Sequence, residues 1–332
     1  MPMKRIVSQL SLLLLLSLTS NAQHPRFYLG FDQILDNREY FTQYGVHQTI
    51  FGARINPGVS FGFDSIHSVH SVHVGLNYMY EFGGTFLGVK PQLDLYYSYQ
   101  TEQLQMKFGS FARREVMDYP LFLLTDSLHY YRPNMEGTSI RYNWKWGTVH
   151  GWVDWMGRES DSIREAIHAG IDATVRLSIF YLSGMTTRSH LARTTDPGDM
   201  NQIRDDGSIM ALAGIDLSDR LFLDKLDFAT GIASTYKHQR PSSFYTWYNG
   251  WYSRLDIRYK IFGIKGTYYF GDPSPLVYGD PLYTSGNYGR IDLFLDPFKK
   301  NSRISSKFAW NFHILPWDGL YHSQQILIQV NL

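Results

Sequence analysis

The chain contains no cysteine among its 332 residues. Disulfides, thiolate nucleophiles, cysteine-ligated metal sites and a lipid anchor on cysteine are therefore excluded. Beyond Ala22 it also lacks any apolar run near the ~18 residues that a membrane-spanning helix needs. Neither sign of charge dominates, since the formal net charge is +1, and nucleic acid is not an expected partner.

The first 22 residues have the three parts of a cleavable signal peptide. Lys4 and Arg5 supply the positive start, leucines between Leu10 and Leu18 supply a short apolar core, and Ala22 supplies a small residue at the cleavage site. The sequence therefore predicts an exported protein with residues 1–22 as signal peptide and 23–332 as one domain.

The mature chain alternates apolar and polar residues over many segments of about ten residues, a spacing that predicts strands with one apolar face. In 139–146, for example, Ile140, Tyr142 and Trp144 alternate with Arg141 and Asn143. We count about sixteen such strands: 25–34, 47–64, 67–81, 85–100, 103–111, 137–146, 148–157, 163–176, 178–187, 207–218, 225–236, 245–259, 261–271, 287–297, 302–314 and 319–332.

Export, strand alternation and an aromatic content of 16% together predict an all-β protein, a transmembrane antiparallel up-and-down β-barrel. We expect about 16 strands (14–18), short periplasmic turns and longer extracellular loops. The aromatic residues would form the two girdles at the membrane interfaces. A secreted soluble β-sandwich or propeller is the alternative.

The whole mature chain resembles bacterial outer-membrane porin-type barrels. The stretch from Lys107 to Arg113, a strand running into a charged loop, is similar to substrate-selective porins and to capsule-assembly barrels. The last strand resembles the sorting signal that the barrel-assembly machinery reads, although Leu332 replaces the commoner aromatic residue. Ala22–Gln23 resembles cleavage sites of the Bacteroidota. The resemblance implies an outer-membrane location and no particular subfamily.

The segment 112–136 is the longest connection and would be the third extracellular loop, which in general porins folds inward and narrows the lumen. We predict a constriction whose charges filter solutes, and the alternative is a loop packed on the barrel rim. The predicted constriction residues are Arg113, Arg114, Glu115, Asp118, Asp126, Tyr130, Tyr131 and Arg132.

A second candidate set consists of charged residues that parity places on the polar, lumen-facing side of their strands. They would form a track for solutes or, alternatively, structural ion pairs. The set is Arg141, Lys145, Asp154, Arg158, Asp172, Arg176, Arg254, Asp256, Arg258, Arg290, Asp292, Arg303 and Lys307.

These features favour a porin-like channel for passive diffusion of small hydrophilic solutes, anionic or sugar-like. A non-conducting barrel for surface-polysaccharide binding or capsule assembly is the first alternative, and an enzyme at the rim is the second. We expect no enzyme, because the sequence lacks G-x-S-x-G and H-E-x-x-H. Asp126, Ser127 and His129 are too close in sequence for a triad.

No metal site or other cofactor is expected from the sequence. The expected partners are outer-membrane lipid and lipopolysaccharide, the barrel-assembly machinery, and small hydrophilic solutes or glycans. The sequence leaves open whether the barrel forms a homo-oligomer.

Overall fold

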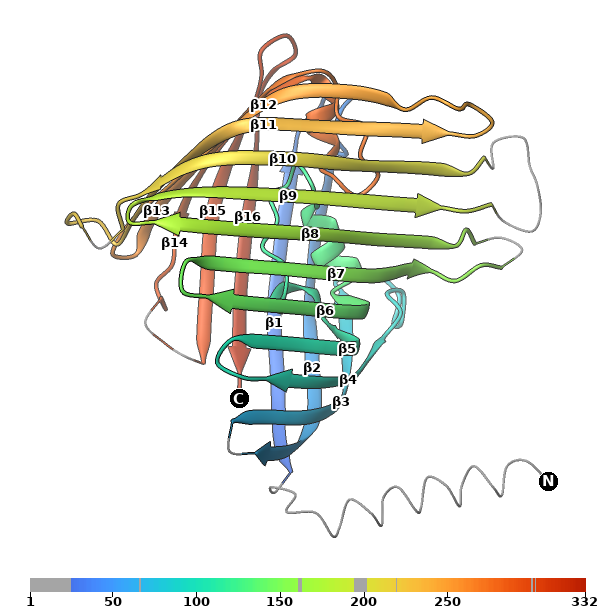
Figure 1. The fold of residues 1–332 in the computed structure, drawn as a ribbon, viewed down its shortest axis with the longest axis vertical. Coiled ribbons are helices and arrows are strands. Elements are labelled where there is room, and N and C mark those ends of the chain that lie inside the picture. Colours follow the sequence, from blue (N-terminus) through green and yellow to red (C-terminus); the bar gives the residue numbers. More distant parts are fainter. Residues whose placement is uncertain are drawn as a thin grey trace.

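A computed structural model describes residues 25–65, 67–160, 163–193, 202–218, 220–299, 301 and 303–332. The predicted signal peptide, 1–22, lies outside the described residues. Sixteen antiparallel strands form one closed barrel in which β1 pairs with β16 (Figure 1), so the predicted fold class is confirmed. The strands are β1 Arg26–Glu39, β2 Gln48–Ser65, β3 Ser68–Glu81, β4 Gln92–Gln100, β5 Leu104–Ala112, β6 Asn134–Trp144, β7 Gly147–Gly157, β8 Ala166–Leu177, β9 Phe180–Leu191, β10 Arg204–Asp216, β11 Lys225–Gln239, β12 Thr246–Tyr259, β13 Phe262–Gly271, β14 Asn287–Leu295, β15 Ile304–Leu315 and β16 Gly319–Asn331.

The two faces of each strand differ as the alternation predicts. In β1, Asp32 and Asp36 are buried inside the barrel, whereas Phe27 and Phe31 are exposed on its outer surface. Large apolar side chains are exposed on strands all round the outside, and a continuous belt of this kind is stable only against lipid. Its members include Ile140, Val153, Ile171, Leu182, Ile209, Ile232 and Trp251.

Two strand boundaries differ by five residues or more from the sequence prediction, and both have a local cause. β1 continues to Glu39, where the alternation is lost because Asn37 and Glu39 are polar on the outer face as well, yet Glu39 still pairs with His322 of β16. β4 begins only at Gln92, because Pro91 has no N–H for the ladder. Among the described residues, no helix is long and apolar enough to cross a membrane.

The core of this barrel lies inside the lumen. The connection between β5 and β6 contains the 3₁₀ helix η1 (Arg113–Glu115) and the helix α2 (Asp126–Tyr131), and the connection between β13 and β14 contains η2 (Pro281–Ser285). In Figure 1 the green helical segment lies between the two walls of strands. Residues of the β5–β6 connection pack against inward-facing strand residues in three apolar clusters, and buried residues of the β13–β14 connection join the largest of them.

Candidate functional site

Residues 113–133, which we call the inward segment, cross the lumen. Phe122 and Leu123 are almost completely buried. The Phe122 ring packs on Tyr252 of β12, Tyr269 of β13 and Tyr283 of η2, with ring centroids 6.0, 5.0 and 5.2 Å away. These residues belong to the mostly apolar stretch Tyr119–Leu124. Exposing this stretch to water would cost free energy, so its burial against the barrel wall explains why the connection turns inward.

Backbone hydrogen bonds tie the inward segment to the connection that contains η2. The Thr125 N–H donates to the Tyr278 carbonyl at 2.8 Å, and the Asp280 N–H donates to the Leu121 carbonyl at 2.8 Å. The two connections therefore form one layer inside the barrel. The inward segment also accepts hydrogen bonds from the opposite wall, where the Arg54 guanidinium of β2 donates to the carbonyls of His129 and Tyr130 at 3.1 and 2.5 Å.

Arg113 anchors the start of the inward segment. Its side chain is fully buried, and Nη2 lies 2.7 Å from Oδ2 of Asp154 on β7. The same guanidinium donates to the carbonyls of Arg132 and Asn134 at 3.2 and 3.0 Å, which fixes the end of the segment against its beginning. The prediction that Arg113 is a constriction residue is therefore wrong, because its fully buried side chain cannot face a solute.

A cavity of about 700 Å³ lies beside the inward segment. Its lining residues include Lys225, Arg258 and Lys307, which lie close to the end of the barrel that carries both termini. Eight Lys or Arg and six Asp line it, which gives a net charge of +2 when His129 is neutral. A cavity with this balance favours an anionic ligand.

Arg114 and Asp32 form one side of the cavity. Nη1 of Arg114 lies 2.8 Å from Oδ2 of Asp32, and the Arg114 side chain is 39% exposed. Asp32 also pairs with Arg54 at 3.3 Å and accepts a hydrogen bond from Gln329 at 3.2 Å. One carboxylate thus serves two guanidinium groups, which leaves surplus positive charge here.

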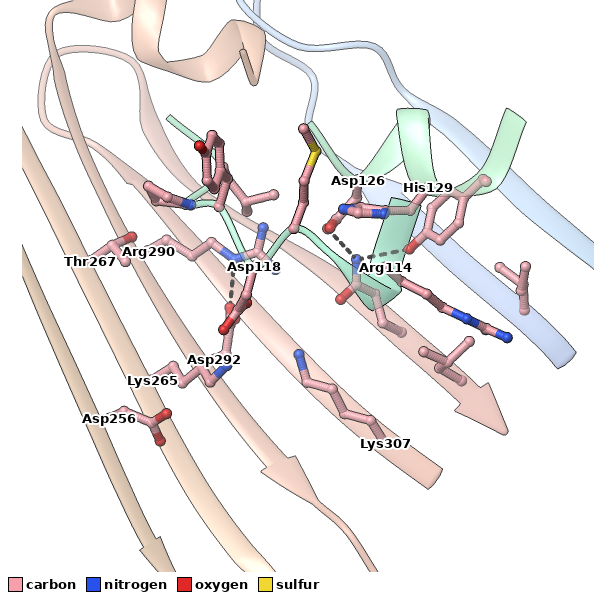
Figure 2. A pocket seen from close by; sticks show the side chains of 18 of the residues that line it. Arg114, Asp118, Asp126, His129, Asp256, Lys265, Thr267, Arg290, Asp292 and Lys307 are labelled. Atoms are coloured by element: carbon pink, nitrogen blue, oxygen red, sulfur yellow. Dashed lines mark hydrogen bonds and ion pairs between the residues drawn. The ribbon is translucent and has the colours of Figure 1, made fainter. Parts of the chain in front are cut away.

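Asp126 and His129 lie three residues apart on α2 and share its cavity-facing side (Figure 2). Gln325 of β16 donates to Oδ2 of Asp126 at 3.2 Å. Burial lowers the pKa of His129, against the opposing charge of Asp126. Burial alone would raise the pKa of Asp126, but the charges of Arg290, His129 and Lys307 outweigh it and lower that pKa. A neutral imidazole therefore lies beside an ionised carboxylate.

Neither ring nitrogen of His129 has a hydrogen-bond partner within the part of the chain that the structure describes. On the opposite wall, Arg290 pairs with Asp292 at 2.6 Å. Lys265 and Lys307 have no carboxylate within ion-pair distance among the described residues, and Lys307 projects into the open space (Figure 2). The cavity thus offers a free base and two unpaired ammonium groups to a ligand.

The other residues of the predicted constriction are distributed between cavity and wall. Asp118 and Tyr130 line the cavity. Glu115 forms an ion pair with Lys107, Tyr131 donates to Glu81 at 2.9 Å, and Arg132 donates to the Met156 carbonyl. These three contacts hold the segment in place, and the role of the segment as a solute filter stays a prediction.

Parity places most of the predicted lumen charges correctly. Those that line the cavity are Arg254, Asp256, Arg258, Arg290, Asp292 and Lys307, and those that bond elsewhere inside the barrel are Arg141, Asp154 and Asp172. Arg176 pairs with Asp216 at the ends of β8 and β10 and is half exposed. Three residues need correction, since they lie beyond the strands. Lys145 occupies the turn between β6 and β7, Arg158 follows the end of β7, and Arg303 precedes β15, all of them exposed to solvent.

Sequence reasoning missed a hydrogen-bonded chain across β6, β7 and β8. The Ser139 Oγ lies 2.9 Å from Nε2 of His150, and Nδ1 of His150 lies 2.9 Å from Oδ1 of Asp172. A signal for this chain was present in the sequence, because the two-residue turn after Trp144 sets the register of β6 and β7. That register places His150 opposite Arg141, close to Ser139. Ser139 and His150 are 4% and 1% exposed and do not line the cavity, so we interpret the chain as a structural one.

Metal binding receives no support from the described residues, in which no group of three His, Cys, Asp or Glu is arranged to hold an ion. Other buried histidines have serine partners as well: Nδ1 of His168 lies 2.9 Å from the Ser189 hydroxyl, and Nε2 of His313 lies 2.9 Å from the Ser323 hydroxyl. Three inward-facing histidines of this barrel therefore form a hydrogen bond with a serine hydroxyl on a neighbouring strand.

The fold and the inward segment define the class: an outer-membrane porin-type barrel whose lumen is crossed by a segment of the chain. Two solved structures show the likeness. A loop-deletion form of OmpT, an outer membrane protein of Vibrio cholerae, matches with a TM-score of 0.57 and 9% identity over 94% of this chain and 99% of that chain. Salmonella typhi OmpF in complex with daunomycin matches with a TM-score of 0.54 and 9% identity, over 93% and 97%.

The family is given by the sequence itself. Residues 19–324 match the model of the lipid A 3'-O-deacylase-type family, and the chain therefore belongs to that family. No curated protein matches the sequence. The expectation that the chain is not an enzyme is wrong, because this family is an enzyme family. The absence of G-x-S-x-G and H-E-x-x-H from the sequence therefore does not exclude an enzyme.

Proposed function

We propose that the protein is an outer-membrane hydrolase that removes an ester-linked acyl chain from a phosphorylated glycolipid of the lipid A type. The observation that carries the proposal is the His129 ring, which has no hydrogen-bond partner among the described residues and lies beside Asp126 at a cavity with a net positive charge. Family membership supplies the reaction class. The proposed location is the outer membrane, and the proposed partners are its lipid and the barrel-assembly machinery.

The proposed chemistry uses the two sides of the cavity differently. Neutral His129 takes a proton from a water molecule that attacks the ester carbonyl, and Asp126 stabilises the imidazolium that forms. His129 then returns the proton to the sugar oxygen as the C–O bond breaks, which yields a free fatty acid and a sugar hydroxyl. Arg114 and Lys307 stabilise the negative charge that develops on the carbonyl oxygen.

The direct test is to incubate the refolded mature protein with lipid A and to follow the products by mass spectrometry. We expect the loss of one acyl chain, with release of the corresponding free fatty acid, and no loss with heat-unfolded protein. Intact lipid A after incubation with protein shown by heat-modifiable gel mobility to be folded would contradict the proposal.

A diffusion pore is the second candidate function, favoured by the charged cavity inside a porin-type fold. The inward segment argues against a wide pore, because it contacts β1, β2, β7, β12 and β16 across the lumen. We expect planar-bilayer recordings of the wild-type protein to show no stable current steps. Regular steps with selectivity for anions would favour the pore.

The proposed base predicts how hydrolysis depends on pH. Because burial lowers the pKa of His129, the ring stays neutral below the usual histidine value of about 6.5. Hydrolysis should persist to that pH and disappear as the pH falls through the lowered pKa. The same sign applies to folding: protonation favours the unfolded chain, so the contribution of His129 to stability is complete above about 6.5 and is lost on acidification. A pH–rate profile beside a pH series of urea unfolding checks both.

A further inference from the structure

A cluster of basic side chains lies on the outer face of β9, β10 and β11, away from the lumen cavity. Asp205 of β10 stands directly between His190 of β9 and His238 of β11 in the register of the sheet. Nδ1 of His190 lies 2.8 Å from Oδ1 of Asp205, and Nδ1 of His238 lies 3.6 Å from Oδ2. The Asp205 side chain is only 3% exposed, so the two imidazoles cover it.

Arg188 lies one row closer to the apolar belt and contacts the same carboxylate. Its Nη2 is 3.5 Å from Oδ1 of Asp205, and its side chain is 62% exposed. Its neighbours across the sheet are Ala169 on β8 and Gly207 on β10, two small residues that leave the guanidinium uncovered. The Tyr236 ring lies over Gly207, where a Cβ would come within 2.5 Å of the Tyr236 hydroxyl and 2.3 Å of the Thr187 carbonyl oxygen. A larger residue at position 207 would therefore have to displace the neighbouring backbone.

The position of the cluster along the strands places it at the level of lipid headgroups. It lies at the barrel end opposite both termini, just beyond the exposed belt residues Ile171 and Ile209. Aromatic residues flank it: the His238 ring stacks on Tyr245 with centroids 4.6 Å apart, and Tyr236 packs on Trp247 at 5.2 Å. Aromatic girdles of outer-membrane barrels mark the two interfaces of the bilayer.

We propose that Arg188 and His190 form a binding site for a phosphate group on the sugar headgroup of an outer-leaflet glycolipid, with the Asp205 carboxylate and His238 holding these two basic groups in place. The exposed guanidinium forms charge-assisted hydrogen bonds to phosphate oxygens. His190 provides a further donor through Nε2, since its Nδ1 faces Asp205. His238 is held on both sides, because its Nδ1 faces Asp205 and its Nε2 donates to the Ser242 carbonyl at 2.7 Å. Tyr236 and Trp247 offer apolar faces to the sugar ring.

A purely structural role explains these contacts less well. One carboxylate forms a complete ion pair with one cation, and Asp205 has three basic neighbours, of which Arg188 remains mostly exposed. A metal site is disfavoured too, because the Nδ1 atoms of both histidines approach Asp205 itself. The Arg188 guanidinium and Nε2 of His190 are therefore the surplus donors, on side chains that are 62% and 35% exposed, where an anionic headgroup would meet them.

The test measures lipid binding by native mass spectrometry of the refolded protein in detergent, with lipid A carrying both phosphates as the probe and enzymatically dephosphorylated lipid A as comparison. We expect the wild type to retain the phosphorylated probe and not the dephosphorylated one. Arg188→Ala and His190→Ala should each weaken retention about tenfold or more, the scale of lost charge-assisted hydrogen bonds. Arg158→Ala, which removes an exposed arginine after β7 at the same end of the barrel, is the matched control.

Three outcomes would overturn the assignment: equal retention by Arg188→Ala and the wild type, equal retention of both probes, or complete displacement of lipid by millimolar inorganic phosphate, which would indicate a site for free phosphate. The site rests on the outer-membrane location in the proposed function and not on hydrolysis. Because this experiment reads bound lipid and the hydrolysis assay reads released fatty acid, failure of one is distinguishable from failure of the other.

Discussion

Replacing His129 by glutamine should abolish the hydrolysis of lipid A while the barrel still folds. Glutamine fills a similar volume and can form hydrogen bonds, but it cannot accept a proton from water at neutral pH. Loss of a general base usually lowers the rate by about 10²–10⁴-fold. Mass spectrometry of the lipid product measures the rate, and heat-modifiable gel mobility confirms the fold.

The matched controls are Ser139→Ala and His150→Gln, which interrupt the buried hydrogen-bonded chain inside the barrel wall. If His129 is the base, Ser139→Ala should hydrolyse lipid A at a rate close to that of the wild type. A reversed result, in which Ser139→Ala is inactive and His129→Gln is active, would move the chemistry from the cavity to the chain of Ser139, His150 and Asp172. Asp126→Asn should give an intermediate loss, because it removes only the charge that stabilises the imidazolium.

The strands were predictable from the sequence because lipid imposes a strict two-residue period on a barrel wall. The pattern fails only where the strands leave the lipid. At the end of β1, Asp36 and Arg38 face inward and Asn37 and Glu39 face outward, so neither face of the strand is apolar. The alternation therefore does not predict this part of the strand. The alternation predicts a lumen position for Lys145, Arg158 and Arg303 only if the strands include them, and all three lie just beyond the strand ends.

The candidate site was less predictable, because its contacts join positions that are far apart in sequence. The charges of the inward segment were evident from composition, but nothing local pairs Arg114 with Asp32, which precedes it by 82 residues. The sequence shows His129 only beside its chain neighbours Asp126 and Ser127. In the structure Ser127 instead accepts a hydrogen bond from Arg38 at 3.1 Å, and a strand residue, Gln325, completes the surroundings of Asp126.

Replacing Arg113 by alanine should destabilise the barrel and release the inward segment. The substitution leaves Asp154 buried without its cation and removes the donors to the carbonyls of Arg132 and Asn134. Breaking a buried ion pair from one side costs about 3–5 kcal/mol. Urea unfolding in lipid vesicles should show a loss of this size, and limited proteolysis should cut within residues 113–133 of the variant and not of the wild type.

The double variant Arg113→Met, Asp154→Leu separates two explanations of that loss. Two apolar residues of similar volume leave no buried charge behind, and such replacements are often neutral or stabilising. If the single variant suffers from the unpaired Asp154 carboxylate, the double variant should recover most of the unfolding free energy and resist proteolysis again. If it recovers stability but the segment is still cut, the bonds from Arg113 to the Arg132 and Asn134 carbonyls hold the segment in the lumen. Unchanged stability of Arg113→Ala would contradict the role of this ion pair as the anchor, because a fully buried carboxylate cannot lose its cation without cost.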